Sequence, residues 1–141
     1  MQAFIVLCDA AQRDTGTGKV HILGADWSVT APSAASTAVV VFLRVPWEEL
    51  AVERTFHLRL VDEAGIVVKV NDDLSIEFGG QMGSLADSGV PEGDPSRLTD
   101  IHSSIAVTVA PLPLVQGATY TWCFDVDGKG LASTTFVVRA S

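Results

Sequence analysis

The stretch Thr119-Tyr-Thr-Trp-Cys-Phe-Asp-Val126, with Asp127-Gly128 and the β-rich run 131–139 behind it, decides the fold class. Every second residue on one face of the first run is large and apolar: Tyr120, Trp122, Phe124 and Val126. Period 2 is the pattern of a strand with one buried face. An Asp-Gly pair between two such runs favours a two-residue hairpin turn. The segment therefore predicts an antiparallel hairpin.

Upstream segments repeat this pattern. Residues 54–62 alternate, with Phe56, Leu58 and Leu60 on one face. Residues 37–45 carry an unbroken apolar run over 39–43, which is typical of a strand buried on both faces. Other short β-rich runs are separated by turn signals: 3–9, 19–27, 66–70, 74–78 and 101–109. This spacing predicts an all-β antiparallel sandwich, immunoglobulin-like or jelly-roll-like, with eight or nine strands in a single domain over residues 1–141.

Two segments interrupt the strand pattern. Pro46-Trp-Glu-Glu-Leu50 combines a proline at a first turn with acids behind it, a helix-start signal. We expect at most one short helix, near 47–52. Residues 79–99 contain five glycines, two prolines and no periodicity. They predict a long flexible loop.

The alternation also predicts the buried face of the sandwich. The expected core residues are Val6, Ile22, Val41, Phe56, Leu58, Leu60, Ile105, Val107, Trp122, Phe124 and Phe136. Cys8 and Cys123 are the two cysteines, and we expect both to be free thiols. Cys123 falls on the face opposite Tyr120, Trp122 and Phe124, so the two sulfurs need not meet.

Composition excludes several classes of partner. The chain has a net charge of −8, which disfavours nucleic acid and anionic membrane surfaces. Only 18% of its 141 residues are charged and 48% are hydrophobic. Either the strands are buried on both faces, covered by the chain's own connecting loops, or part of the surface is covered by a partner. No run approaches the length of a membrane helix, and no basic residue precedes the short apolar opening. We therefore expect a soluble protein without a signal peptide, located in the cytoplasm or in a virion.

Motifs for catalysis or cofactor binding are not evident, and we predict no catalytic residue, no cofactor and no metal. Three weaker patterns also have ordinary explanations. His21, His57 and His102 would form a metal site only if the fold brought them together, and each equally suits a solvated strand face. Asp125-Val-Asp127-Gly128 resembles the start of a calcium loop but lacks the later glutamate, so a hairpin turn explains it better. Four aromatic residues could form a sugar-stacking platform, but core packing also explains them: Trp27, Trp47, Tyr120 and Trp122.

The opening of the chain carries a family resemblance. The run Leu7-Cys-Asp-Ala-Ala-Gln12, the run Gly18-Lys-Val-His-Ile-Leu-Gly24 and Trp27 are similar to an uncharacterised family of small actinobacterial and phage proteins. The turn Val61-Asp-Glu-Ala-Gly65 and the hairpin Phe124-Asp-Val-Asp-Gly128 fit the same layout loosely. The resemblance implies a β-sandwich, and it carries over no functional residue.

These observations favour a non-catalytic structural or protein-interaction module over an enzyme. Its partner is expected to be a protein, either copies of itself in a homo-oligomer or a larger assembly. The family resemblance implies one concrete version, a phage capsid or tail accessory protein. The alternative is a β-sandwich that binds a small ligand or a glycan. The candidate interaction residues are Trp47, Met82 and Leu85.

Overall fold

The computed structural model describes residues 1–32, 36–83, 90–109 and 111–140. The all-β prediction is confirmed, although the described residues form twelve strands where eight or nine were expected. The strands are β1 Gln2–Cys8, β2 Ala10–Arg13, β3 Val20–Leu23, β4 Val29–Thr30, β5 Thr37–Val45, β6 Arg54–Val61, β7 Lys69–Asn71, β8 Leu74–Ser75, β9 Glu77–Met82, β10 Ile101–Val109, β11 Thr119–Val126 and β12 Lys129–Val138. The count was too low because strands of two to four residues, such as β4 and β8, are too short to show an alternation.

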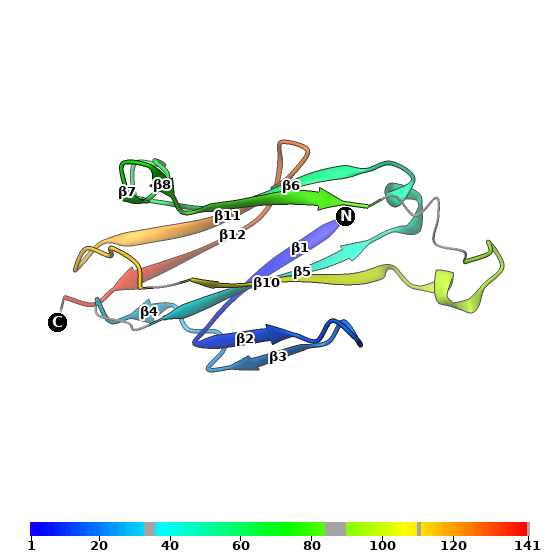
Figure 1. The fold of residues 1–141 in the computed structure, drawn as a ribbon, viewed down its shortest axis with the longest axis horizontal. Coiled ribbons are helices and arrows are strands. Elements are labelled where there is room, and N and C mark those ends of the chain that lie inside the picture. Colours follow the sequence, from blue (N-terminus) through cyan, green and yellow to red (C-terminus); the bar gives the residue numbers. More distant parts are fainter. Residues whose placement is uncertain (33–35, 84–89, 110, 141) are drawn as a thin grey trace.

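Two sheets face each other, an arrangement consistent with a β-sandwich (Figure 1). One sheet has the order β4-β12-β11-β6-β9, and the other has the order β1-β5-β10. The pairings are antiparallel except that β4 runs parallel to β12. Two further hairpins, β2–β3 and β7–β8, form small sheets of their own.

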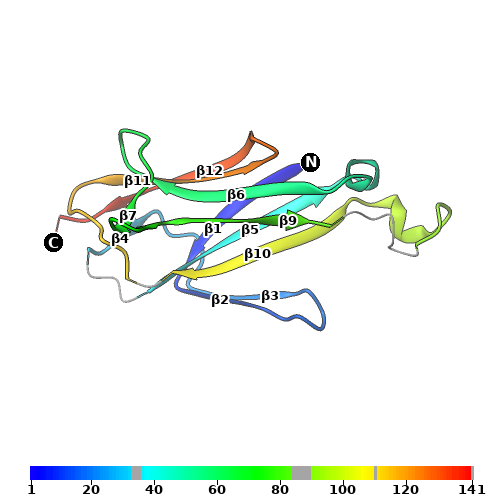
Figure 2. The same ribbon diagram turned by 45° about the horizontal axis from the view of Figure 1, so that its top comes forward.

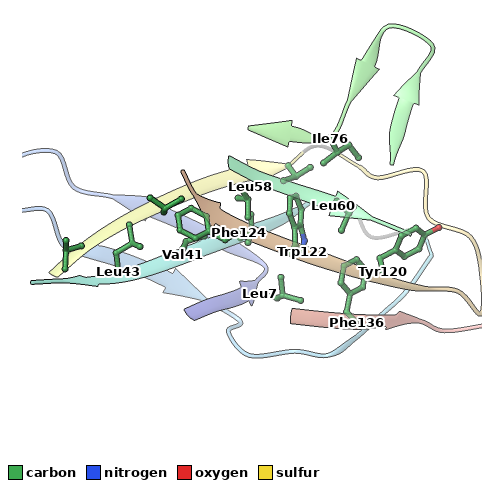
Figure 3. Close-up of a cluster of buried hydrophobic side chains, with 14 of the residues drawn as sticks. Leu7, Val41, Leu43, Leu58, Leu60, Ile76, Tyr120, Trp122, Phe124 and Phe136 are labelled. Atoms are coloured by element: carbon green, nitrogen blue, oxygen red, sulfur yellow. The ribbon is translucent and has the colours of Figure 1, made fainter. Parts of the chain in front are cut away.

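The core lies between the two main sheets (Figure 3). Val41 and Leu43 enter it from β5, and Trp122 and Phe124 enter it from β11. The core prediction is confirmed for six residues buried at 2% exposure or less: Val41, Leu58, Leu60, Trp122, Phe124 and Phe136. Three others are half-buried against this core: Phe56, Ile105 and Val107.

Two core predictions were wrong. In β1 the residue that enters the core is Leu7, at 3% exposure, so the neighbouring Val6 faces the other side of its sheet. Ile22 belongs to a separate apolar cluster, in which the β2–β3 hairpin packs against Cys8, Ala38 and Val40. The hairpin thus covers part of the outer face of the three-stranded sheet, which explains why β5 is apolar on both faces.

The closing hairpin has the predicted turn. Asp127 and Gly128 connect β11 to β12 with φ values of 51° and 79°, the positive values of a two-residue hairpin turn. The Asp127 carboxylate accepts hydrogen bonds from the Thr55 backbone N–H at 3.0 Å and from Arg54 at 3.3 Å. This carboxylate therefore ties the turn to the start of β6.

The interruptions of the strand pattern differ from the prediction. One turn of 3-10 helix, η1, forms at Trp47–Leu50 as expected, but a second, η3, forms at Pro95–Leu98. Asp94 caps η3 by accepting the Ser96 N–H at 2.9 Å. The predicted loop 79–99 begins too early, because residues 79–82 pair with β6 as part of β9. The glycines of this segment gave no strand pattern, although β9 forms there and pairs with β6, which is distant in sequence.

The two cysteines differ in environment, which gives a first test of the fold. Both are free thiols. Cys8 is fully buried, its Sγ lies 3.5 Å from the Ala38 carbonyl oxygen, and burial raises its pKa, with a smaller contribution from Asp9. Cys123 is half-buried beside a surface hollow. We expect a thiol reagent at neutral pH to modify Cys123 at least about tenfold faster, because reactivity requires an accessible thiolate. Mass spectrometry of peptides from briefly labelled native protein measures the ratio, and equal rates would contradict this burial.

A glycine holds the β2–β3 hairpin against β1, and its substitution gives a second test. Gly24 has a φ of 63°, and a Cβ at this position would collide with the Asp9 carboxylate. Gly65→Ala is a matched control, since Gly65 has a φ of 78° and a Cβ there would have no neighbouring atom within 4 Å. We expect Gly65→Ala to lower the free energy of unfolding by about 1 kcal/mol and Gly24→Ala by about 2 kcal/mol or more. Equal losses in urea denaturation would show that the Asp9 contact is unimportant.

Candidate functional site

The edge strand β9 of the five-stranded sheet and the edge strand β10 of the three-stranded sheet lie on the same side of the molecule (Figure 2). A groove of about 300 Å³ opens there. Its walls are mainly apolar side chains from both sheets and from η1: Leu43, Val45, Leu50, Phe56, Met82, Ile101 and Ile105. The groove is therefore an entrance to the core at this side of the sandwich.

Phe56 shapes the groove wall on the five-stranded sheet. It pairs with Gly80 across β6 and β9, and a Cβ at Gly80 would lie 2.9 Å from the Phe56 ring. The ring also stacks on Phe124 with centroids 6.1 Å apart. A side chain at position 80 would push the ring, so this glycine lets Phe56 lie flat against β9.

Trp47 stands at the same end of the sandwich, where η1 and the segment before β10 meet. Its Nε1–H donates to the Thr99 carbonyl oxygen at 3.0 Å, and the Arg97 guanidinium lies 4.7 Å from its ring centroid. Trp47 is thus half-buried and anchors the approach to β10, while neighbouring Leu98 is 86% exposed. Of the predicted interaction residues, Met82 lines the groove, Trp47 flanks it, and Leu85 lies outside the described residues.

The free edge of β10 is the most regular of the sheet edges. β10 pairs with β5 over nine residues without a register shift, and no pairing is formed on its other side among the described residues. The strand contains no proline, lysine or bulge, which are the usual devices that block further strand pairing. The other edges are shorter: β9 has six residues, and β4 has two. The fourth edge strand, β1, packs beside β12, and β2 lies close to β10 without pairing with it.

The pKa shifts in the structure belong to turns and to the core. Hydrogen bonds from the Gly16 and Thr17 backbone N–H groups lower the pKa of Asp14. Hydrogen bonds from the Ser96 side chain and backbone lower the pKa of Asp94. Together with the raised pKa of Cys8, these shifts lie away from the groove. The groove is mainly apolar in chemical character.

A family model described as a family of unknown function, DUF6941, matches residues 3–139. The chain belongs to DUF6941. No curated protein sequence matches it. The match agrees with the predicted membership of an uncharacterised family, while the actinobacterial and phage origin stays a prediction.

The three histidines of this DUF6941 chain lie on three different sheets. His57 on β6 has Nε2 3.3 Å from Glu77 and Nδ1 3.9 Å from Asp125. His21 lies on β3 and His102 on β10. Within the described ranges, no group of three or more metal-ligating side chains converges. The structure therefore does not bring the three-histidine candidate together.

The other two weak candidates have structural roles. Asp125 accepts a hydrogen bond from Arg59, and Asp127 fixes the hairpin turn to β6. The aromatic residues do not form a platform. Tyr120 and Trp122 are buried, Trp27 packs edge-on to Phe136 with centroids 5.4 Å apart, and Trp47 contacts Arg97.

The sequence did not reveal that β10 is an edge strand in this DUF6941 member. The alternation over 101–109 predicted β10 and its inward residues correctly, but strand order decides which strands are edges. A signal was present in the sequence, since the segment has no lysine, proline or acid in nine residues.

Within the described ranges, no helix has the length and apolarity needed to span a membrane.

Proposed function

We propose that this DUF6941 chain is a non-catalytic protein-assembly module, and that the β10 edge of one copy pairs with the β10 edge of a second copy. The observation that carries the proposal is the regular nine-residue edge of β10, which leaves a row of backbone N–H and C=O groups free to pair beside an apolar groove. Pairing two such edges joins two three-stranded sheets into one of six strands.

The sequence of β10 is compatible with pairing to itself. In an antiparallel pair centred on Ile105, Ile101 faces Val109 of the second copy and Ser103 faces its Val107. The inward side of the contact is therefore mostly apolar. His102 is the only titratable residue in the strand, so the contact adds little like-charge repulsion although each chain carries −8.

Self-pairing would also cover half-buried apolar side chains at the groove. The β2–β3 hairpin covers part of the outer face of the three-stranded sheet, and Ile101, Ile105 and Met82 stay half-buried at the groove. A second copy at the β10 edge would cover much of this remaining apolar surface. A place in a phage capsid or tail is the finer version of this proposal, and it rests on the family resemblance alone.

The groove supports a second candidate function, binding of a small apolar ligand. Its volume of about 300 Å³ is at the lower end of ligand sites, and its walls are largely apolar. The oligomeric state separates the two functions, because a groove that serves only a ligand does not require a dimer.

Sedimentation velocity of the purified chain, from low to high micromolar concentration, tests the proposal. We expect a concentration-dependent shift from the 14.9 kDa monomer to a species of twice that mass. The dimer should persist at high salt, because backbone hydrogen bonds and apolar burial hold it. A monomer at all concentrations would refute self-pairing and leave the ligand function as the better explanation.

A further inference from the structure

A second surface lies on the outer face of the three-stranded sheet, and β10 contributes part of its lining. A hollow of about 390 Å³ forms where the end of the β2–β3 hairpin stands over β5 and β10. Its lining includes Lys19 from the hairpin, Phe42 and Arg44 from β5, and His102 and Ser104 from β10. Two of the chain's nine lysines and arginines thus face one hollow on a protein with a net charge of −8.

These cationic groups are available to a ligand. Neither Lys19 nor Arg44 has a carboxylate partner among the described residues, whereas Arg54 and Arg59 pair with Asp127 and Asp125. Arg44 instead lies 5.5 Å from the centroid of the Phe4 ring. Nearby Asp14 is already engaged by the Gly16 and Thr17 backbone N–H groups.

An apolar rim adjoins the hollow. Phe4 is 46% exposed and stacks on Phe42 with ring centroids 5.1 Å apart. A complementary partner would therefore combine negative charge with exposed aliphatic side chains.

The β7–β8 hairpin of the same chain has that chemistry. Its two-residue tip is Asp72-Asp73, between Asn71 and Leu74, and neither carboxylate has an ion-pair partner among the described residues. Val70 and Leu74 beside the tip are 48% and 55% exposed. The tip thus presents two acids flanked by aliphatic side chains.

The two surfaces lie on opposite layers of the molecule. The β7–β8 hairpin is joined to the five-stranded sheet through Leu60 of β6, whose carbonyl oxygen accepts the Val68 N–H at 2.9 Å and whose N–H donates to the Ile76 carbonyl oxygen at 3.1 Å. The hollow instead lies on the three-stranded sheet. Figure 1 shows β7–β8 above the main sheets and β2–β3 below them. One copy therefore cannot fill its own hollow with its own tip.

We propose that the hollow binds the acidic β7–β8 tip of another copy, with Asp72 and Asp73 facing Lys19 and Arg44, and with Val70 and Leu74 near Phe4. A contact between two different surfaces is heterologous, so it builds a ring or an open filament. It uses the outer face of the three-stranded sheet, whereas the pairing proposed above uses the hydrogen-bonding edge of β10. Together the two contacts would link dimers into a larger assembly.

Paired charge reversals test this contact. Lys19→Glu/Arg44→Glu reverses the hollow and Asp72→Lys/Asp73→Lys reverses the tip. Sedimentation equilibrium at about 0.01 M ionic strength, where charges act over about 30 Å, measures the average mass. The wild-type mass should exceed that of the dimer and return to it at about 1 M salt, where screening shortens the range to about 3 Å. Each reversed variant alone should lose association beyond the dimer by roughly a hundredfold, because like charges then face each other.

The equal mixture of the two reversed variants is the decisive sample. Each reversed hollow meets a reversed tip and each normal hollow meets a normal tip, so the mixture should regain the wild-type mass. Glu48→Lys/Glu92→Lys alters the net charge by the same amount as the reversed tip at other exposed positions, and it should assemble like the wild type. A mixture that stays dimeric, or a wild type that never exceeds the dimer, would overturn the proposal. Loss of the dimer itself would count against β10 pairing instead, which keeps the two proposals separate.

Discussion

Ser103→Lys is expected to abolish the dimer while the monomer stays folded. Ser103 is half-buried on the groove side of β10, opposite Leu43 of β5. In a monomer the long lysine side chain reaches water through the open side of the sandwich. In a β10-paired dimer the second copy would close that route, leaving an unpaired ammonium buried. Because burying an unpaired charge is costly, we expect the dimer dissociation constant to rise by about a hundredfold or more.

Two variants control this experiment. Ser103→Ala removes the hydroxyl without adding a charge and should dimerise like the wild type. Ser133→Lys places a lysine at an exposed position of β12 in the other main sheet, where Ser133 pairs with Cys123 of β11, and it should also dimerise. Sedimentation velocity measures the dissociation constants, and circular dichroism verifies the fold. A folded Ser103→Lys protein that dimerises normally would exclude the β10 edge as the contact.

Leu7→Ala is expected to destabilise the chain far more than Val6→Ala. Leu7 is 3% exposed within the main core, so its truncation should lower the free energy of unfolding by about 2–5 kcal/mol. Val6 is half-buried on the opposite side of β1, so we expect a loss of about 1 kcal/mol or less. Urea denaturation at one low protein concentration keeps the dimer equilibrium from distorting the comparison. The reverse ranking would mean that β1 pairs with β5 in a register shifted by one residue.

The wrong assignment of Val6 to the core shows that alternation cannot identify the buried face of a strand that is apolar on both faces. In β11 the apolar residues alternate with polar ones, so Trp122 and Phe124 could be assigned to the core directly. In β1 both faces are apolar, because Cys8 packs under the β2–β3 hairpin while Leu7 packs in the core. An unbroken apolar run does not say which residues face which layer.

The candidate site was predicted less completely than the fold. Met82 lines the groove as expected, but its strand β9 was hidden in a glycine-rich segment, where Gly80 leaves room for Phe56. The basic hollow combines Lys19 of the β2–β3 hairpin with Arg44 of β5 and His102 of β10, which are far apart in sequence. Such groupings depend on strand order and on long-range pairing, and neither follows from local alternation.

Hydrogen–deuterium exchange of β10 at a series of protein concentrations tests the central proposal most directly. In a monomer the amides of Ile101–Val109 that point to the free edge have no backbone partner in the described part of the chain, so they should exchange quickly. We predict that protection in this strand rises with the dimer fraction measured by sedimentation, while protection at the edge strands β4 and β9 does not change. If a dimer forms and exchange along β10 stays the same, or if protection rises only at another edge, the assignment of β10 as the assembly edge is contradicted.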